Sequence, residues 1–173
     1  MREKKTNKNL EKDHLPVYGV GPICVYLMVG VLVLLIGLKH FGHLDSGDAS
    51  RFSGGFNLIG LILIFFGVYM WVKTVIIGRI EDYILENHLC TTGMYAVVRN
   101  PIYSAIAIGL TGVALIFHNW WFMVFPLFCW LDITIFMKAT EEKWMLELYG
   151  EEYVEYCRKV NRCIPWFPKK SEK

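Results

Sequence analysis

The chain has 173 residues, of which 54% are hydrophobic and 15% aromatic, and its formal net charge is only +2. This composition excludes an intrinsically disordered chain, and the confinement of charged residues to the two ends and to short connecting stretches excludes an ordinary soluble domain. We therefore predict an all-α integral membrane protein with about four transmembrane helices and no separate soluble domain.

The predicted elements begin with a polar N-terminal tail, residues 1–16, which carries acids as well as bases and lacks the pattern of a cleaved signal. A four-span bundle at 17–137 follows, because four apolar runs are each about long enough to cross the hydrocarbon. Residues 138–173 then form an amphipathic cytoplasmic segment. The four spans are expected at about 17–38, 56–77, 102–118 and 120–137.

Lysine and arginine are distributed unevenly between the two sides of this arrangement. If the N-terminus is cytoplasmic, the tail contributes five, the stretch 73–99 three and the residues from 138 onward eight, so that sixteen of the eighteen lie inside. Cytoplasmic loops retain positive charge during insertion. We predict that both termini are cytoplasmic and that Trp120 and Trp121 lie at the outer interface.

Small residues recur at helical spacing in the first three spans and predict close packing between helices. Side chains gain little from leaving lipid for one another, so membrane helices associate through small residues that let backbones approach. We interpret these residues as structural: Gly30, Gly37, Gly60, Gly67, Ala105, Gly109 and Gly112.

The motif Arg99-Asn100-Pro101-Ile102-Tyr103 opens the third span. Asn is a favoured N-cap and Pro is favoured at the first helical position, so one interpretation is a well-formed helix start with an interfacial arginine. The other is an anion site, because the free N–H groups and partial positive charge of a helix N-terminus beside Arg99 suit a carboxylate or phosphate.

The fourth span returns to the same face and ends in Glu141 and Glu142. Arg99 lies nineteen residues before the His118-Asn119 turn and Glu142 twenty-three after it, so a helical hairpin brings the two together. The amphipathic stretch that follows either covers a site at this face or anchors the tail. Asp132 lies inside the fourth span, where a carboxylate is costly unless it is paired. It either makes a structural hydrogen bond or lines the path of a substrate.

In their order and spacing these motifs resemble the membrane methyltransferases related to isoprenylcysteine carboxyl methyltransferase and the phospholipid N-methyltransferases. The hallmark of that family is Arg-His-Pro-x-Tyr followed by Glu-Glu, and the chain matches it except that Asn100 replaces the histidine. The resemblance covers roughly the module 89–167, including Leu-Tyr-Gly-Glu-Glu-Tyr and a final Ile-Pro. Asn100 can form a hydrogen bond but has no titratable group, so the resemblance implies no proton transfer at this position.

The resemblance implies an S-adenosylmethionine pocket without a Rossmann motif. The sulfonium and ammonium of this donor suit carboxylates and aromatic faces, and its carboxylate suits N–H groups. Catalytic roles fall to Arg99, Glu142 and Asp132. The residues implied for the donor are Gly93, Tyr95, Asn100, Pro101, Tyr103, Glu141 and Glu142.

The implied acceptor is lipophilic: a carboxylate, amine or thiol of an isoprenoid or a phospholipid-like molecule. The other expected partner is membrane lipid, with no nucleic acid. The five cysteines are scattered and never paired as CxxC, so neither a disulfide framework nor a metal site is expected. A carboxylate acceptor needs no base, whereas an amine or thiol needs a proton sink, for which Glu142 and Asp132 are the candidates.

Two rival functions remain open at this point. One is a membrane reductase that shares the C-terminal module, although we expect such an enzyme to need a longer chain with more spans. The other is a non-catalytic four-helix transporter subunit or scaffold, which predicts charges facing one another in the bundle centre. The charges of the C-terminal half instead gather at one membrane face, apart from Asp132.

Overall fold

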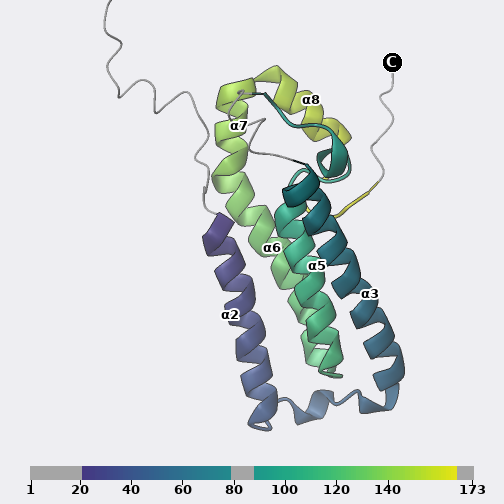
Figure 1. The fold of residues 1–173 in the computed structure, drawn as a ribbon. Coiled ribbons are helices and arrows are strands. Elements are labelled where there is room, and N and C mark those ends of the chain that lie inside the picture. Colours follow the sequence, from purple (N-terminus) through teal and green to yellow (C-terminus); the bar gives the residue numbers. More distant parts are fainter. Residues whose placement is uncertain (1–20, 79–87, 167–173) are drawn as a thin grey trace, which may run out of the picture.

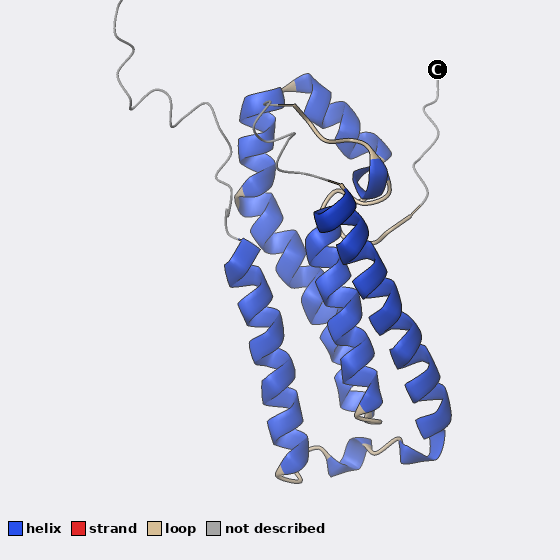
Figure 2. Ribbon diagram, in the orientation of Figure 1, coloured by secondary structure: helices blue, strands red, loops and turns tan. Residues whose placement is uncertain are grey.

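The computed structural model describes residues 21–78 and 88–166, and within these ranges the chain folds into a bundle of helices (Figures 1 and 2). The described residues contain no β-strand, only two isolated bridges. The predicted all-α class is therefore confirmed. The predicted tail 1–16 and the expected start of the first span at residue 17 lie outside the described residues.

Four long helices make up the bundle. Three segments, Gly21–His40, Ser50–Ile77 and Trp120–Ala139, are long and apolar enough to cross a membrane, whereas the helix Pro101–Ile116 is shorter. The count of four spans therefore stays a prediction. The helices are α2 (Gly21–His40), α3 (Ser53–Trp71, continued by a π-helical turn at Val72–Ile77), α5 (Pro101–Ile116) and α6 (Val124–Ala139, preceded by a 3-10 turn at Trp120–Met123).

Two short helices, α7 (Glu141–Tyr149) and α8 (Glu151–Lys159), stand where one amphipathic segment was expected. The chain turns between them at Gly150, whose φ of +54° is a conformation that glycine adopts without steric cost. Both helices lie at the end of the bundle where α6 ends (Figure 1), which we call the site end. The opposite end, which holds the α2–α3 and α5–α6 connections, is the far end.

Helices α3 and α5 pack through glycine, as the small-residue pattern predicts. A Cβ on Gly60 would lie 2.8 Å from the backbone oxygen of Gly112, and one on Gly67 would lie 2.7 Å from that of Ala105. The two backbones can approach this closely only because the side chains are missing. The same prediction was wrong for Gly30 and Gly37, because nothing lies within 4 Å of a Cβ added at either position and α2 uses other residues for its contacts.

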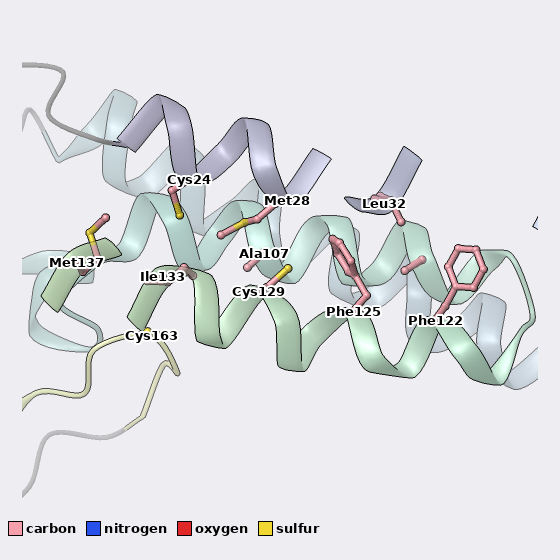
Figure 3. Packing of buried hydrophobic residues seen from close by; sticks show 11 residues of the cluster. Cys24, Met28, Leu32, Ala107, Phe122, Phe125, Cys129, Ile133, Met137 and Cys163 are labelled. Atoms are coloured by element: carbon pink, nitrogen blue, oxygen red, sulfur yellow. The ribbon is translucent and has the colours of Figure 1, made fainter. Parts of the chain in front are cut away.

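The main apolar core lies between α2, α5 and α6 (Figure 3). Met28 of α2 and Phe125, Cys129 and Ile133 of α6 are almost fully buried there. The outward faces of α2, α3 and α6 instead expose large apolar side chains, among them Val33, Phe65 and Ile135, which are 61%, 70% and 61% exposed. Exposed apolar surface of this extent suits a lipid surround.

The far end is closed by hydrogen bonds from the α5–α6 turn to the α2–α3 connection. Asn119, buried at 1% exposure, donates from Nδ2 to the backbone oxygen of Leu44 at 2.8 Å and accepts from the backbone N–H of Trp121 at 2.9 Å. The backbone N–H of Ala49 donates to the oxygen of His118, and Lys39 donates to the oxygen of Phe117. These bonds join the α5–α6 turn to the end of α2 and to the α2–α3 connection.

Candidate functional site

The site end is built where the segment before α5 meets the segment after α8. Val98 forms a parallel bridge with Asn161, and the backbone N–H of Arg99 donates to the oxygen of Asn161 at 2.8 Å. The N–H of Asn100 donates to the oxygen of Arg162 at 3.2 Å. We call residues 160–166 the return segment. This pairing places the motif that opens α5 beside the C-terminal part of the described chain.

Helix α6 is interrupted at Thr140, whose φ of −131° and ψ of −81° lie outside the helical region, and α7 begins at the next residue. The oxygen of Phe136 accepts both the backbone N–H of Thr140 at 3.1 Å and its hydroxyl at 2.6 Å, so Thr140 is bonded twice to the last turn of α6. Glu141 and Glu142 therefore stand in the first turn of a separate helix.

Glu142 lies between two arginines. Arg162 binds it through two hydrogen bonds, from Nε to Oε1 at 2.5 Å and from Nη2 to Oε2 at 2.9 Å. Nη1 of Arg99 lies 3.3 Å from the same Oε1. The structure thus brings together Arg99 and Glu142, which the hairpin argument placed near one another, and adds Arg162, which the sequence interpretation missed.

Arg99 is deeply placed, with a side chain only 9% exposed. Besides Glu142, its Nη1 contacts the sulfur of Cys157 in α8. Its Nε is buried and has no hydrogen-bond partner among the described residues. A buried charged donor without an acceptor is costly, so the Nε–H of Arg99 is suited to donate a hydrogen bond to an anionic oxygen of a ligand.

Glu141 is bound by Tyr103 of α5, whose hydroxyl donates to Oε1 at 3.0 Å. Burial raises the pKa of the Glu141 carboxyl, and the hydrogen bond from Tyr103 opposes this shift only in part. The ring of Tyr103 also packs against Gly21, where a Cβ would collide with it. Tyr103 therefore connects the start of α2 to the Glu-Glu helix.

Asn100 occupies the N-cap position of α5 but does not cap with its side chain. Its Nδ2 donates instead to the oxygen of Arg162 at 3.0 Å. The predicted capping role was wrong because the return segment offers a carbonyl that the local sequence does not reveal. Pro101 stands at the first helical position as expected.

Gly93 and Tyr95 belong to the 3-10 turn Gly93–Ala96 that precedes the motif. Gly93 has a φ of +59°, is exposed, and would have open space around an added Cβ. The backbone oxygen of Tyr95 accepts a hydrogen bond from the hydroxyl of Tyr156 at 2.6 Å, so α8 fixes this turn. Burial raises the pKa of Tyr156 and keeps that hydroxyl protonated as a donor.

Asp132 lies apart from this cluster, deeper in the bundle and only 5% exposed. Its Oδ2 accepts a hydrogen bond from the thiol of Cys24 in α2 at 2.8 Å. The structural hydrogen bond, one of the two roles left open for Asp132, is therefore present.

Arg162 and Tyr156 are the residues of the site end that the sequence interpretation did not assign to it. Both follow the turn at Gly150, and the pairing of the return segment with residues 98–100 brings Arg162 to Glu142. The one local feature that could have pointed to Arg162 is its position two residues before Ile164-Pro165, a segment already included in the family resemblance. Among the described residues, no group of three or more His, Cys, Asp or Glu is placed to hold a metal ion.

Comparison with known proteins gives a family match that covers the α5 motif and the Glu-Glu pair. Residues 55–152 match the phospholipid methyltransferase family. Two curated relatives, from Oryza sativa subsp. indica and Oryza sativa subsp. japonica, are both named probable protein-S-isoprenylcysteine O-methyltransferase. Each is 30% identical over 120 residues, which make up 64% of this chain and 61% of the relative. The chain therefore spans less than two thirds of the length of these relatives.

Proposed function

We propose, from the premise that this chain belongs to the phospholipid methyltransferase family, that it is an integral membrane methyltransferase. Its donor is S-adenosylmethionine and its acceptor is a lipophilic molecule that reaches the site end from the membrane. The observation that carries the proposal is the 3.3 Å contact between Arg99 and Glu142, which joins the two motifs of the family match in one site.

The residues at the site end fit the charges of this donor. The buried, unpartnered Nε of Arg99 suits the donor carboxylate. Glu141 uses Oε1 for Tyr103, which leaves Oε2 for the ammonium or sulfonium of the donor. Both oxygens of Glu142 are bound by Arg162. We therefore propose that Glu142 positions the two arginines and does not bind the donor itself. The exposed turn at Gly93 and the aromatic ring of Tyr95 are the remaining donor-binding candidates.

When bound, the donor supplies an electrophilic methyl carbon on its sulfonium. Methyl transfer from it is an in-line displacement, so the chain has to align the two reactants and exclude water. Tyr103 and Glu141 are fixed to one another from α5 and α7, and Tyr156 holds the Gly93–Ala96 turn from α8. We infer that these contacts set the position of the donor relative to the end of the bundle.

The nature of the acceptor decides whether a base is required. A carboxylate acceptor is already anionic and needs none, whereas an amine must lose a proton. Glu141 suits the second case better than Glu142, because burial raises its pKa and Tyr103 binds only Oε1; Oε2 would then serve the amine in place of the donor cation. Asp132 suits it less, since Oδ2 is occupied by the thiol of Cys24. The names of the two relatives favour the carboxylate of a prenylated cysteine as the acceptor of this chain.

The direct test is binding and transfer with the purified full chain in lipid nanodiscs. Calorimetric titration with S-adenosylmethionine should show saturable binding, which neither a reductase nor a scaffold would give. Transfer of labelled methyl groups to a farnesylated cysteine, with phosphatidylethanolamine in parallel, then identifies the acceptor class.

A matched pair of variants supports the same test. Glu141→Gln should weaken donor binding, whereas Glu147→Gln, on the exposed side of α7, should leave it unchanged. Absence of donor binding in the unmodified chain would refute the proposed function. Equal effects of the two substitutions would remove Glu141 from the donor site.

A further inference from the structure

The cluster of Arg99, Glu142 and Arg162 holds two cations and one anion. The single carboxylate is not shared equally, because Arg162 takes both of its oxygens, at 2.5 and 2.9 Å, while Arg99 reaches only one of them, at 3.3 Å. A bidentate guanidinium–carboxylate pair is the strongest of these arrangements. Glu142 is therefore bound principally by Arg162, and Arg99 is left incompletely paired.

If Arg162 were absent, we would expect Arg99 to form a bidentate ion pair with Glu142. Its side chain is 9% exposed, against 25% for Arg162, and a more deeply buried charge needs a partner more. The unpartnered Nε shows that this need is not met within the described residues. In the absence of Arg162, a small rotation of Glu142 would let it pair bidentately with Arg99.

The backbone of Arg162 is held independently of its side chain. Its carbonyl accepts from the backbone N–H of Asn100 at 3.2 Å and from Nδ2 of Asn100 at 3.0 Å. The neighbouring residue, Asn161, is bound by the N–H of Arg99 at 2.8 Å. Removal of the guanidinium should therefore leave the return segment in place.

We propose that Arg162 is a positioning residue: by saturating Glu142 it keeps the guanidinium of Arg99 available for a carboxylate-bearing ligand. The proposal rests on the proposed function for the identity of that ligand. The carboxylate belongs either to the methyl donor or to an anionic acceptor, and both would meet the same nitrogen of Arg99. Arg162 itself contacts Glu142 and acts through it.

A double-variant cycle in the full chain tests this arrangement, with S-adenosylhomocysteine as the probe for the donor side. Arg162→Met should weaken binding by about 10- to 100-fold, the loss expected when a charge-assisted hydrogen bond is no longer available. Arg162→Met combined with Glu142→Gln should recover most of that loss, because a neutral amide cannot capture Arg99. Arg158→Met, an exposed arginine on α8, is the matched control and should bind as the unmodified chain does.

The same cycle separates the two sources of the carboxylate. If the acceptor supplies it, binding of S-adenosylhomocysteine stays constant throughout the cycle, while the KM for a farnesylated cysteine rises in Arg162→Met and falls again in the double variant. Recovery in either readout supports the proposal. A double variant that is as impaired as Arg162→Met in both readouts would overturn it.

Two ligand-free measurements keep the test independent of the proposed function. Hydrogen exchange at the backbone amides of Arg99 and Asn100 should be the same in Arg162→Met as in the unmodified chain. Faster exchange would show that the Arg162 side chain holds the return segment in place, and would overturn the proposal. The alkylation rate of Cys157 should change in Arg162→Met, because Arg99 moves from that sulfur towards Glu142, and should return to that of the unmodified chain in the double variant. If the unmodified chain binds no donor, the proposed function fails. The alkylation rates then test the positioning role of Arg162 by themselves, and unchanged rates would refute that role.

Discussion

The two ends of the bundle are fixed by hydrogen bonds of different kinds. At the far end, buried Asn119 uses both its amide nitrogen and its amide oxygen, and backbone groups take part in most of the contacts. At the site end, charged side chains from three segments meet, and the Nε of Arg99 remains without a partner among the described residues. Among the described residues, no buried side-chain nitrogen or oxygen of the far end lacks a hydrogen-bond partner, whereas the site end keeps the unpartnered Nε of Arg99.

The contact between α3 and α5 joins the two ends, and we expect its disruption to have the largest effect. In Gly112→Val the new side chain would meet the backbone of Gly60 and the side chain of Ile64, which should cost about 3 kcal/mol of unfolding free energy. Gly30→Val, which meets nothing within 4 Å, is the control. Thermal unfolding in detergent should show a lower midpoint for Gly112→Val only, and equal midpoints would contradict the packing described above.

The next effect should be confined to the site end. Arg99→Met removes the buried cation while leaving Glu142 paired with Arg162, so donor affinity should fall by about 10- to 100-fold with little loss of stability. Calorimetric titration with S-adenosylhomocysteine measures the change, and Arg51→Met at the far end is the matched control. An Arg99 variant that keeps both donor affinity and turnover would return this residue to the role of an interfacial anchor.

The converse substitution at the far end should affect stability alone. Asn119→Leu keeps the branched shape of the side chain but leaves the oxygen of Leu44 and the N–H of Trp121 without their partner, at a cost of about 1–3 kcal/mol. Chemical denaturation measures the loss, and donor affinity below the transition should be unchanged. A variant with normal stability but weaker donor binding would show that the two ends are not independent.

The smallest effect concerns the pH dependence of stability. Because burial raises the pKa of Glu141 above its ordinary 4.5, the folded state holds this proton more tightly than the unfolded state. The resulting stabilisation is complete below pH 4.5 and is lost as the pH rises through the folded pKa. Glu141→Gln removes this dependence and keeps an oxygen for Tyr103.

The unfolding free energy of the unmodified chain minus that of Glu141→Gln should therefore fall with rising pH. Glu147→Gln, exposed on the same helix, is the control for this measurement. A difference that grows with pH would mean that Glu141 is stabilised as the carboxylate, and would remove the basis for its proposed part in proton transfer.

Apolar run length was sufficient to predict the helical class. Small-residue spacing predicted that helices pack through glycine, but not that α3 and α5 form the close pair, because Gly30 and Gly37 of α2 show the same spacing without such a contact. The hairpin argument was sufficient to bring Arg99 near Glu142, since it depends only on the rise of a helix on each side of one turn. The position of Arg162 was not predictable in this way. It depends on the reversal at Gly150 and on parallel pairing between segments far apart in sequence, neither of which has a periodic signal. The capping prediction for Asn100 was wrong for the same reason, because its partner is the carbonyl of Arg162.

The pairing of the return segment with residues 98–100 also imposes an order on biosynthesis. Synthesis proceeds from the N-terminus, so α2 to α6 have been made before Asn161 and Arg162 exist. Until they emerge, the backbone N–H groups of Arg99 and Asn100 lack their described acceptors, and of the two described partners of Glu142 just Arg99 is present. A nascent chain that already has its bundle helices therefore still lacks the arrangement proposed to bind the donor. On this basis the proposed donor site is complete only after residue 162 has left the ribosome.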